Sequence, residues 1–173
     1  QTVDKCTVET NVKNGELLSY IIDFEALYQK GYRSLLTDVD NTLVRHGAPS
    51  DRRSEAFFEK LHRTGWKTCV ISNNNKERVA PFAEKNRCLY ICDAGKPGTK
   101  GYFQGMEMMG SDLSDTVFMG DQLFTDIYGA NRAGMKSILV KPVHLDKKPF
   151  ILLKRLGELI VKKFYFRYAK KHP

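Results

Sequence analysis

Short apolar runs alternate along the chain with longer stretches in which apolar residues recur every three or four positions. The apolar runs have the length and β-branched or aromatic content of buried strands, and they cover residues 34–37, 67–71, 88–92, 116–119 and 136–140. The stretches between them have helical periodicity, and they cover residues 23–29, 54–63, 76–85, 100–109 and 123–132. A last helical pattern runs over residues 150–168.

Regular alternation of strands and helices predicts an α/β fold, in which the strands are parallel and the crossovers are right-handed. We therefore expect a Rossmann-like parallel sheet of about five strands flanked by helices. Ligands of such sheets collect at the carboxyl ends of the strands. Polar residues do follow four of the predicted strands, at Asp38, Ser72, Lys96 and Asp121.

Two acids follow the first strand within a segment that is otherwise apolar. Asp38 and Asp40 are separated by Val39 and followed by Thr42. Two carboxylates this close repel each other unless a cation shares them. A carboxylate can attack a phosphate ester, and a second one can move the proton. We predict that Asp38 is the nucleophile, that Asp40 is the general acid and base, and that Thr42 holds the loop and the phosphate.

The second and third strands bring candidate phosphate ligands. Ser72 and Asn73 follow an apolar strand and open a helix, whose N-terminus favours an anion. Lys96 lies in a Gly-rich loop and would neutralise charge on the attacked phosphate. Lys100 competes with Lys96 for this role. Thr99 is expected to cap the next helix.

The fourth strand ends in Asp121, and Asp126 follows five residues later. Mg²⁺ prefers oxygen ligands and keeps several of its waters. We predict a Mg²⁺ site formed by Asp38, the backbone carbonyl of Asp40, and Asp121, with Asp126 binding the metal's waters.

These motifs occur in the order found in the haloacid dehalogenase (HAD) superfamily. The chain resembles its subfamily IIIA, and within it the YqeG type, which is similar to phosphatidylglycerophosphate phosphatases. The resemblance covers residues 21–143 and extends to the segment 129–135. It implies a Mg²⁺-dependent phosphatase that works through an aspartyl-phosphate, with phosphatidylglycerophosphate as a candidate substrate. We expect one domain over residues 1–173, with the catalytic core at 21–143.

Many HAD enzymes insert a cap domain over the active site. Here 34 positions separate Asp38 from Ser72, and 24 separate Ser72 from Lys96, so neither interval can hold a domain. We therefore expect an open site without a cap. Such a site suits a bulky or membrane-resident phosphate ester, or a lid contributed by a second copy in a homo-oligomer.

The net charge of +8 is concentrated at the C-terminal end. Residues 147–173 hold nine Lys or Arg and one acid, whereas the other 146 residues hold nineteen of each sign. Four apolar residues recur there at helical spacing: Leu153, Leu156, Ile160 and Phe164. We expect this helix to pack its apolar stripe on the protein's own core or on a second copy, to lie on anionic membrane or RNA, or to do both, with the apolar stripe inward and the basic face outward.

Composition bears on location and on the other function classes. The chain has no run of eighteen apolar residues, no export signal and no C-x-x-C spacing. We therefore expect a reduced cytoplasmic protein without zinc. Peripheral contact of this protein with the inner face of the membrane is a further expectation. One alternative is a basic RNA-, ribosome- or membrane-binding protein with a vestigial phosphatase site. No RNA-binding motif supports it, and nucleic acid is not an expected partner. A phospho-accepting receiver domain is disfavoured because Asp40 would hasten hydrolysis.

Overall fold

Strand β1 (Ser34–Thr37) lies at the centre of a five-stranded parallel sheet in the computed structural model, which describes residues 20 and 22–144. The strand order is β3-β2-β1-β4-β5, and every neighbouring pair is parallel. The other strands are β2 (Lys67–Ile71), β3 (Leu89–Ile91), β4 (Thr116–Gly120) and β5 (Lys136–Leu139). The helices are α1 (Phe24–Gln29), α2 (Arg52–Arg63), α3 (Lys76–Lys85), α4 (Lys100–Met109), the π-helical turn η2 (Leu123–Ile127) and α5 (Tyr128–Arg132). The predicted α/β class and sheet are confirmed.

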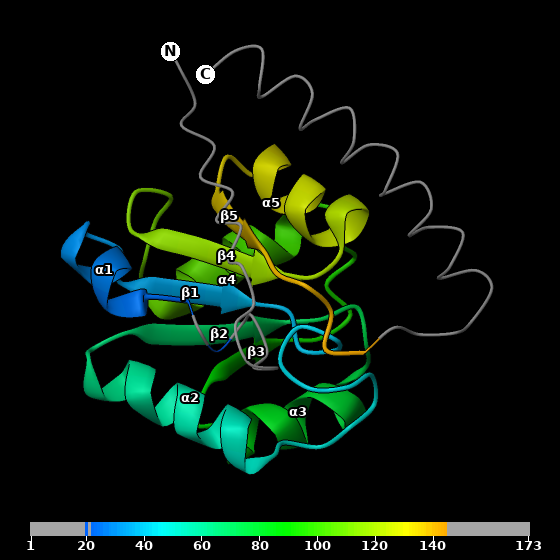
Figure 1. Cartoon of the computed structure of the whole chain (residues 1–173). Coiled ribbons are helices and arrows are strands. Elements are labelled where there is room, and N and C mark those ends of the chain that lie inside the picture. The colour runs from blue at the N-terminus through cyan, green and yellow to red at the C-terminus, as the bar shows by residue number, and fades with distance from the viewer. Residues whose placement is uncertain (1–19, 21, 145–173) are drawn as a thin grey trace. The chain divides into compact units, whose positions relative to one another are not determined.

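Helices cover both faces of the sheet: α2 and α3 lie on one face, and α4 and α5 lie on the other (Figure 1). Because side chains alternate along a strand, Leu35 packs into the core on the α2 and α3 side, whereas Leu36 packs against α4 and α5. Both leucines are fully buried. Burial on both faces explains why the strands have continuous apolar runs.

The register of the central strands aligns their carboxyl ends. Thr37, the last residue of β1, pairs with Val70 of β2 and with Met119 of β4. Asp38 continues the ladder by one step, since its amide donates to the Met119 carbonyl at 2.9 Å. The polar residues that follow these strands therefore meet at one edge of the sheet.

Local side-chain contacts shift some boundaries from those expected. Helix α2 begins two residues earlier than predicted because Asp51 accepts from the Ser54 amide at 2.9 Å, and Ser54 in turn accepts from the Asp51 amide at 3.0 Å. Thr99 precedes α4, but it makes no capping hydrogen bond with its side chain, so that expectation is wrong.

The predicted helix over residues 123–132 is divided into η2 and α5. A π-helical turn leaves backbone carbonyls that need other donors. The Tyr102 hydroxyl from α4 lies 3.1 Å from the Thr125 carbonyl and 3.0 Å from the Asp126 carbonyl, and it donates to them. This packing of α4 against the turn supports the irregular start of the helix.

The chain between β1 and α2 is a loop with no inserted domain, as the spacing predicted. Among residues 20 and 22–144, no helix has the length and apolar character needed to cross a bilayer. The compact unit described here ends at Val143, and a second unit begins at His144. The predicted basic helix over residues 147–173 lies outside the described residues.

Candidate active site

The loop after β1 is held by its own apolar side chains. Val39, Leu43 and Val44 are almost fully buried, and the amides of Leu43 and Val44 both donate to the Val39 carbonyl, at 3.0 and 3.3 Å. Asn41 adopts a left-handed backbone conformation, with φ of 63°, which this short side chain tolerates. The turn therefore folds back on the core and fixes the backbone that carries the two acids, Asp38 and Asp40.

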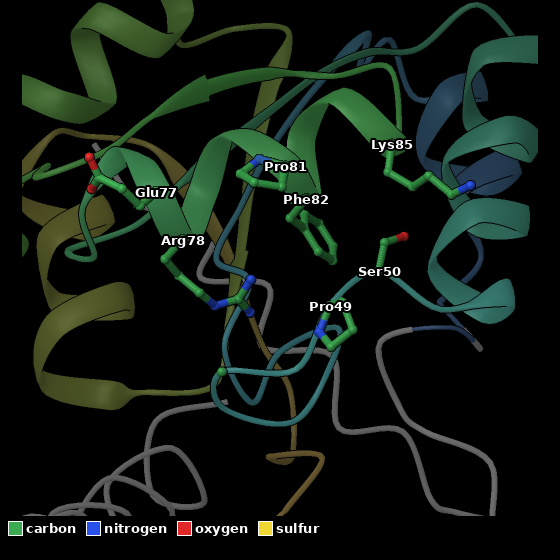
Figure 2. Close-up of a pocket in the computed structure, with 8 residues that line it drawn as sticks. Pro49, Ser50, Glu77, Arg78, Pro81, Phe82 and Lys85 are labelled. Carbon is green, nitrogen blue, oxygen red and sulfur yellow. The ribbon is translucent and has the colours of Figure 1, made fainter.

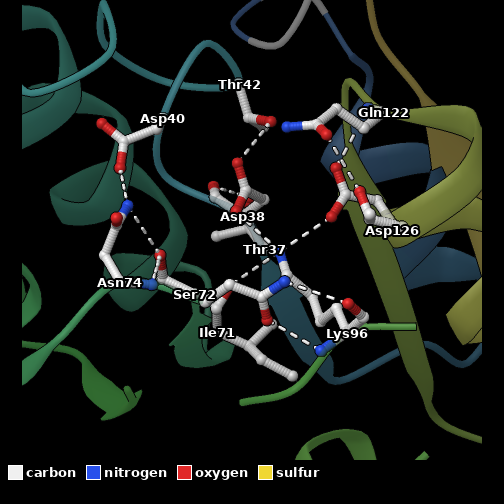
Figure 3. A network of polar contacts seen from close by, with 12 residues as sticks. Thr37, Asp38, Asp40, Thr42, Ile71, Ser72, Asn74, Lys96, Gln122 and Asp126 are labelled. Carbon is white, nitrogen blue, oxygen red and sulfur yellow. Dashed lines mark hydrogen bonds and ion pairs between the residues drawn. The ribbon is translucent and has the colours of Figure 1, made fainter. Parts of the chain in front are cut away.

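Lys96 joins the first and fourth strands of the predicted site. Its Nζ lies 2.7 Å from Asp38 Oδ1 and 2.7 Å from Asp126 Oδ1, and it also donates to the Ile71 carbonyl at 3.0 Å (Figure 3). All three charged side chains are buried. Lys100 is the exposed first residue of α4, so Lys96 is the lysine that reaches these carboxylates.

The buried charges change the protonation of one another. Burial raises the pKa of Asp38 from 3.8 to about 7, and the nearby Asp126 carboxylate adds to the increase, although Lys96 opposes it. Burial alone would lower the pKa of Lys96, but Asp126 and Asp38 together raise it above its ordinary value. The lysine therefore remains charged.

Three carboxylates converge at the carboxyl ends of β1 and β4. Asp38, Asp121 and Asp126 each offer an oxygen atom within 4.8 Å of the other two. Thr42 Oγ1 lies 3.2 Å from Asp38 Oδ2 and 3.3 Å from Asp121 Oδ1, so it bridges two of them. The second oxygen of Asp126 accepts from the Gln122 amide at 3.0 Å, which fixes its orientation.

Asp40 is anchored separately, toward α3. Its Oδ1 accepts from the Gly47 amide at 2.7 Å and from Arg78 at 2.8 Å, and its Oδ2 accepts from Asn74 at 2.7 Å. His46 lies 3.9 Å from Oδ1. Among the described residues, Oδ1 of Asp40 thus has two close donors and Oδ2 has one, which leaves Oδ2 a lone pair for a further contact.

Ser72 and Asn73 follow β2 but differ in their contacts. Ser72 Oγ accepts from the Asn74 amide at 3.1 Å, and its own hydrogen has no acceptor within the described part of the chain. The side chain of Asn73 donates to the Lys96 carbonyl at 3.0 Å and accepts from the Lys96 amide at 2.7 Å. Asn73 therefore holds the Lys96 loop, and Ser72 retains a hydroxyl that can donate to an anion.

The structure thus brings Asp38, Thr42, Lys96, Asp121 and Asp126 into direct contact or close proximity, and it links Ser72 to Asp40 through Asn74 (Figure 3). Sequence reasoning missed Asn74 and Arg78 as partners of Asp40. Asn74 lies just before the predicted helix over residues 76–85 and Arg78 lies in its first turn, and no local pattern pairs either with Asp40. Sequence reasoning also missed Tyr102, which no local pattern distinguishes from a core aromatic.

Comparisons with known proteins agree with this geometry. A profile for HAD-hydrolase-like proteins matches residues 93–142. The chain is 38% identical over 120 residues to the probable phosphatase YqeG of Bacillus subtilis (strain 168), an alignment that covers 69% of this chain and 70% of that protein. It is 27% identical over 161 residues to phosphatidylglycerophosphate phosphatase 1, chloroplastic/mitochondrial, of Arabidopsis thaliana, but the alignment covers 83% of this chain and only 44% of that protein.

Solved structures share the fold at low sequence identity. A protein of Listeria monocytogenes serotype 4b matches with a TM-score of 0.52 and 16% identity, covering 68% of this chain and 85% of that chain. The cobalt-bound deoxy-D-mannose-octulosonate 8-phosphate phosphatase of Haemophilus influenzae matches with a TM-score of 0.50 and 14% identity, covering 65% and 81%. The 38% sequence identity to YqeG and the profile match over residues 93–142 show that this chain belongs to the HAD-like hydrolases, in the phosphatase branch that YqeG represents.

Proposed function

We propose that the protein is a Mg²⁺-dependent phosphatase that hydrolyses a phosphomonoester through an aspartyl-phosphate on Asp38. The observation that carries the proposal is the placement of this buried carboxylate beside the Lys96 ammonium and within 4.8 Å of the Asp121 and Asp126 carboxylates. An anionic nucleophile and positive charge for the phosphoryl oxygens are thereby gathered at one point.

The donor set fits a divalent cation. Three buried carboxylates, those of Asp38, Asp121 and Asp126, each offer an oxygen within 4.8 Å of the other two. Carboxylate oxygens gathered in this way are the ligands that Mg²⁺ prefers. Asp38, Asp121 and the carbonyl of Asp40 would hold Mg²⁺, and Asp126 would orient its waters. When bound, the ion supplies positive charge to the phosphoryl oxygens.

The proposed chemistry has two steps. In the first, a carboxylate oxygen of Asp38 bonds to phosphorus, the bond from phosphorus to the alcohol oxygen breaks, and Asp40 gives its proton to that oxygen. In the second, a water attacks the phosphorus of the aspartyl-phosphate, Asp40 takes a proton from the water, and phosphate leaves Asp38. Lys96 supplies positive charge beside the phosphoryl oxygens, and the Ser72 hydroxyl donates to one of them.

The contacts of Asp40 suit the part assigned to it. Gly47 and Arg78 donate to Oδ1, whereas Asn74 is the one donor to Oδ2 in the part of the chain that the structure describes. We assign proton transfer to Oδ2, because a carboxylate oxygen with one donor can still meet an alcohol or a water. Arg78 and Asn74 are then positioning residues for the acid and base.

Phosphatidylglycerophosphate is the substrate that we propose first. Support comes from the names of the relatives in Arabidopsis thaliana and in Chlamydomonas reinhardtii, the second of which is 28% identical over 153 residues. The chain spans 44% and 56% of these two proteins, so their activity is carried over as a proposal. A site without a cap is open to a phosphate at a membrane surface. Membrane contact through residues 147–173 and assembly into a homo-oligomer remain predictions from the sequence.

The test is turnover with a conservative variant of the nucleophile. Wild type should release phosphate from p-nitrophenyl phosphate and from phosphatidylglycerophosphate in vesicles when Mg²⁺ is present, and chelation should stop it. Asp38→Asn should abolish both turnover and acid-stable labelling of the protein by substrate phosphate. Asp93→Asn is the matched control, because Asp93 is exposed and has a φ of 48°, which Asn also adopts.

The same assay tests the second acid. Asp40→Asn should slow turnover by about 10²- to 10⁴-fold, the usual contribution of a general acid and base. If Asp38→Asn turns over as fast as wild type, the covalent mechanism is wrong. If phosphatidylglycerophosphate is inert while other esters react, only the substrate assignment is wrong.

A further inference from the structure

A pocket of about 430 Å³ lies beside the catalytic loop, outside the group of residues that hold the phosphate in the proposal. It is formed by residues 47–50 on one side and by α3 on the other (Figure 2). Three apolar side chains, Pro49, Pro81 and Phe82, contribute to its walls. Pro49 and Pro81 are exposed, so this apolar surface faces a space that solvent or a ligand can enter.

Two wall residues of the pocket are also the residues that hold Asp40. The Gly47 amide and the Arg78 guanidinium both line the pocket and both donate to Asp40 Oδ1. A general acid must lie within about 2.6–3.2 Å of the oxygen that it protonates. The alcohol oxygen of a bound ester would therefore lie next to Asp40 Oδ2, and the residues of the pocket wall contact Oδ1 of the same carboxylate, so the atoms beyond the alcohol oxygen would lie near this pocket.

We propose that the pocket is the subsite for the leaving alcohol of the substrate, and that it takes an apolar segment close to the ester oxygen. The proposal rests on the phosphatase function proposed above. Its occupant is the substrate itself, because the pocket is continuous with the residues that orient the general acid.

The charges around the pocket leave its apolar surface as the main source of selectivity. The Arg78 guanidinium is already paired with Asp40 at 2.8 Å. Lys85 lies 3.9 Å from Glu55, and Glu77 contributes a negative charge on the same helix. Since the charges nearly cancel, the pocket has no strong preference for an anion or a cation. Contact with Pro49 and Pro81 then favours carbon over a hydroxylated chain.

A series of n-alkyl phosphates from methyl to hexyl tests the assignment, with glycerol 3-phosphate as the polar comparison and phosphate release as the signal. Each methylene that becomes fully buried raises kcat/KM about fourfold, and one that is half buried raises it about twofold. The values should increase along the series until the pocket is filled. Glycerol 3-phosphate should be turned over less efficiently than propyl phosphate.

Two substitutions at one exposed position give a matched comparison. Pro81→Leu keeps an apolar wall, whereas Pro81→Glu places a carboxylate there, and the two side chains are similar in length. Both remove a proline from the interior of α3, so any effect on the helix is shared. We expect Pro81→Leu to keep the rise with chain length and Pro81→Glu to lose most of it.

The outcomes separate the two proposals. Turnover that does not depend on chain length in wild type, or an equal rise in both Pro81 variants, would overturn the pocket assignment and leave the phosphatase function intact. Turnover of glycerol 3-phosphate above that of propyl phosphate would also overturn it. Failure to hydrolyse any member of the series, together with failure on p-nitrophenyl phosphate, would remove the phosphatase function and this subsite with it. The carbons next to the ester oxygen of phosphatidylglycerophosphate belong to a glycerol, so turnover of alkyl phosphates above that of this lipid in vesicles would support the subsite and count against the lipid as the substrate.

Discussion

Replacing Lys96 with methionine removes the charge at the centre of the site and keeps most of the side-chain volume. In wild type the ammonium bonds to Asp38 and Asp126 at 2.7 Å each, and the exposed fractions of the three side chains are 3%, 8% and 1%. Taking away one partner of a buried ion pair typically costs about 3–5 kcal/mol, because the other charge stays buried without compensation. Here Asp126 loses its partner, whereas Asp38 can take up a proton because burial raises its pKa to about 7, so we expect a loss within that range at pH 7 without metal.

Urea unfolding in the presence of a chelator measures this loss, and Lys100→Met is the matched control. Lys100 is exposed at the start of α4, so its substitution should change the free energy of unfolding by less than about 0.5 kcal/mol. Since domains of ordinary size are stable by about 5–15 kcal/mol, the effect of Lys96→Met is large enough to resolve.

A second measurement separates charge from packing. Adding Mg²⁺ should recover part of the stability lost in Lys96→Met, because a divalent cation at the carboxylates compensates the same charge. If the variant unfolds within about 1 kcal/mol of wild type without metal, the buried ion pairs do not stabilise the site as argued. If Mg²⁺ stabilises neither wild type nor the variant, the carboxylates are not a metal site.

Three further predictions follow from the described contacts. A Cβ at Gly120 would lie 2.7 Å from Asp126 Oδ2, so Gly120→Ala should displace that carboxylate and weaken Mg²⁺ binding about tenfold or more, as measured by calorimetric titration. A Cβ at Gly129 would lie 2.6 Å from the hydroxyl of the buried Tyr102, so Gly129→Ala should lower the free energy of unfolding by about 1–3 kcal/mol, and a smaller change in urea would show that the contact relaxes freely. Burial raises the pKa of Asp38 from 3.8 to about 7, so between these pH values the folded protein without metal holds a proton that the unfolded chain has lost. The free energy of unfolding of wild type should therefore fall relative to that of Asp38→Asn as the pH rises from about 4 to about 7. An equal difference between the two proteins at pH 4 and pH 7 would contradict this.

The fold and the principal charged residues could be predicted from the sequence because both depend on strand ends. Asp38 and Asp121 each follow an apolar run, and parallel strands bring such residues to one edge whatever the details of packing. The sequence favours Lys96 over Lys100 as the lysine of the site but does not decide between them, because the reach of a lysine side chain depends on the path of its loop. The structure shows that path, with Asn73 bonded to the backbone of Lys96.

The anchoring of Asp40 could not be predicted because it depends on side chains from separate elements. Arg78 lies 38 residues from Asp40 in sequence, and its contact requires that α3 be placed beside the loop after β1. The pocket arises from the same placement. The division of the helix after β4 depends on Tyr102, whose hydroxyl reaches the turn from α4. Long-range contacts of this kind leave no periodic signal in the chain.

The position of β1 in the middle of the sheet has a consequence for a chain that is still being synthesised. β1 pairs on one side with β2, which follows soon after it, but on the other side with β4, which begins only at Thr116. A nascent polypeptide that has emerged as far as residue 115 carries Asp38 and Lys96 yet lacks both the strand and the acids that complete their surroundings. Phosphatase activity on the ribosome should therefore be absent until β4 and the two acids that follow it, Asp121 and Asp126, have emerged, and its appearance would report that the central strand has acquired both neighbours.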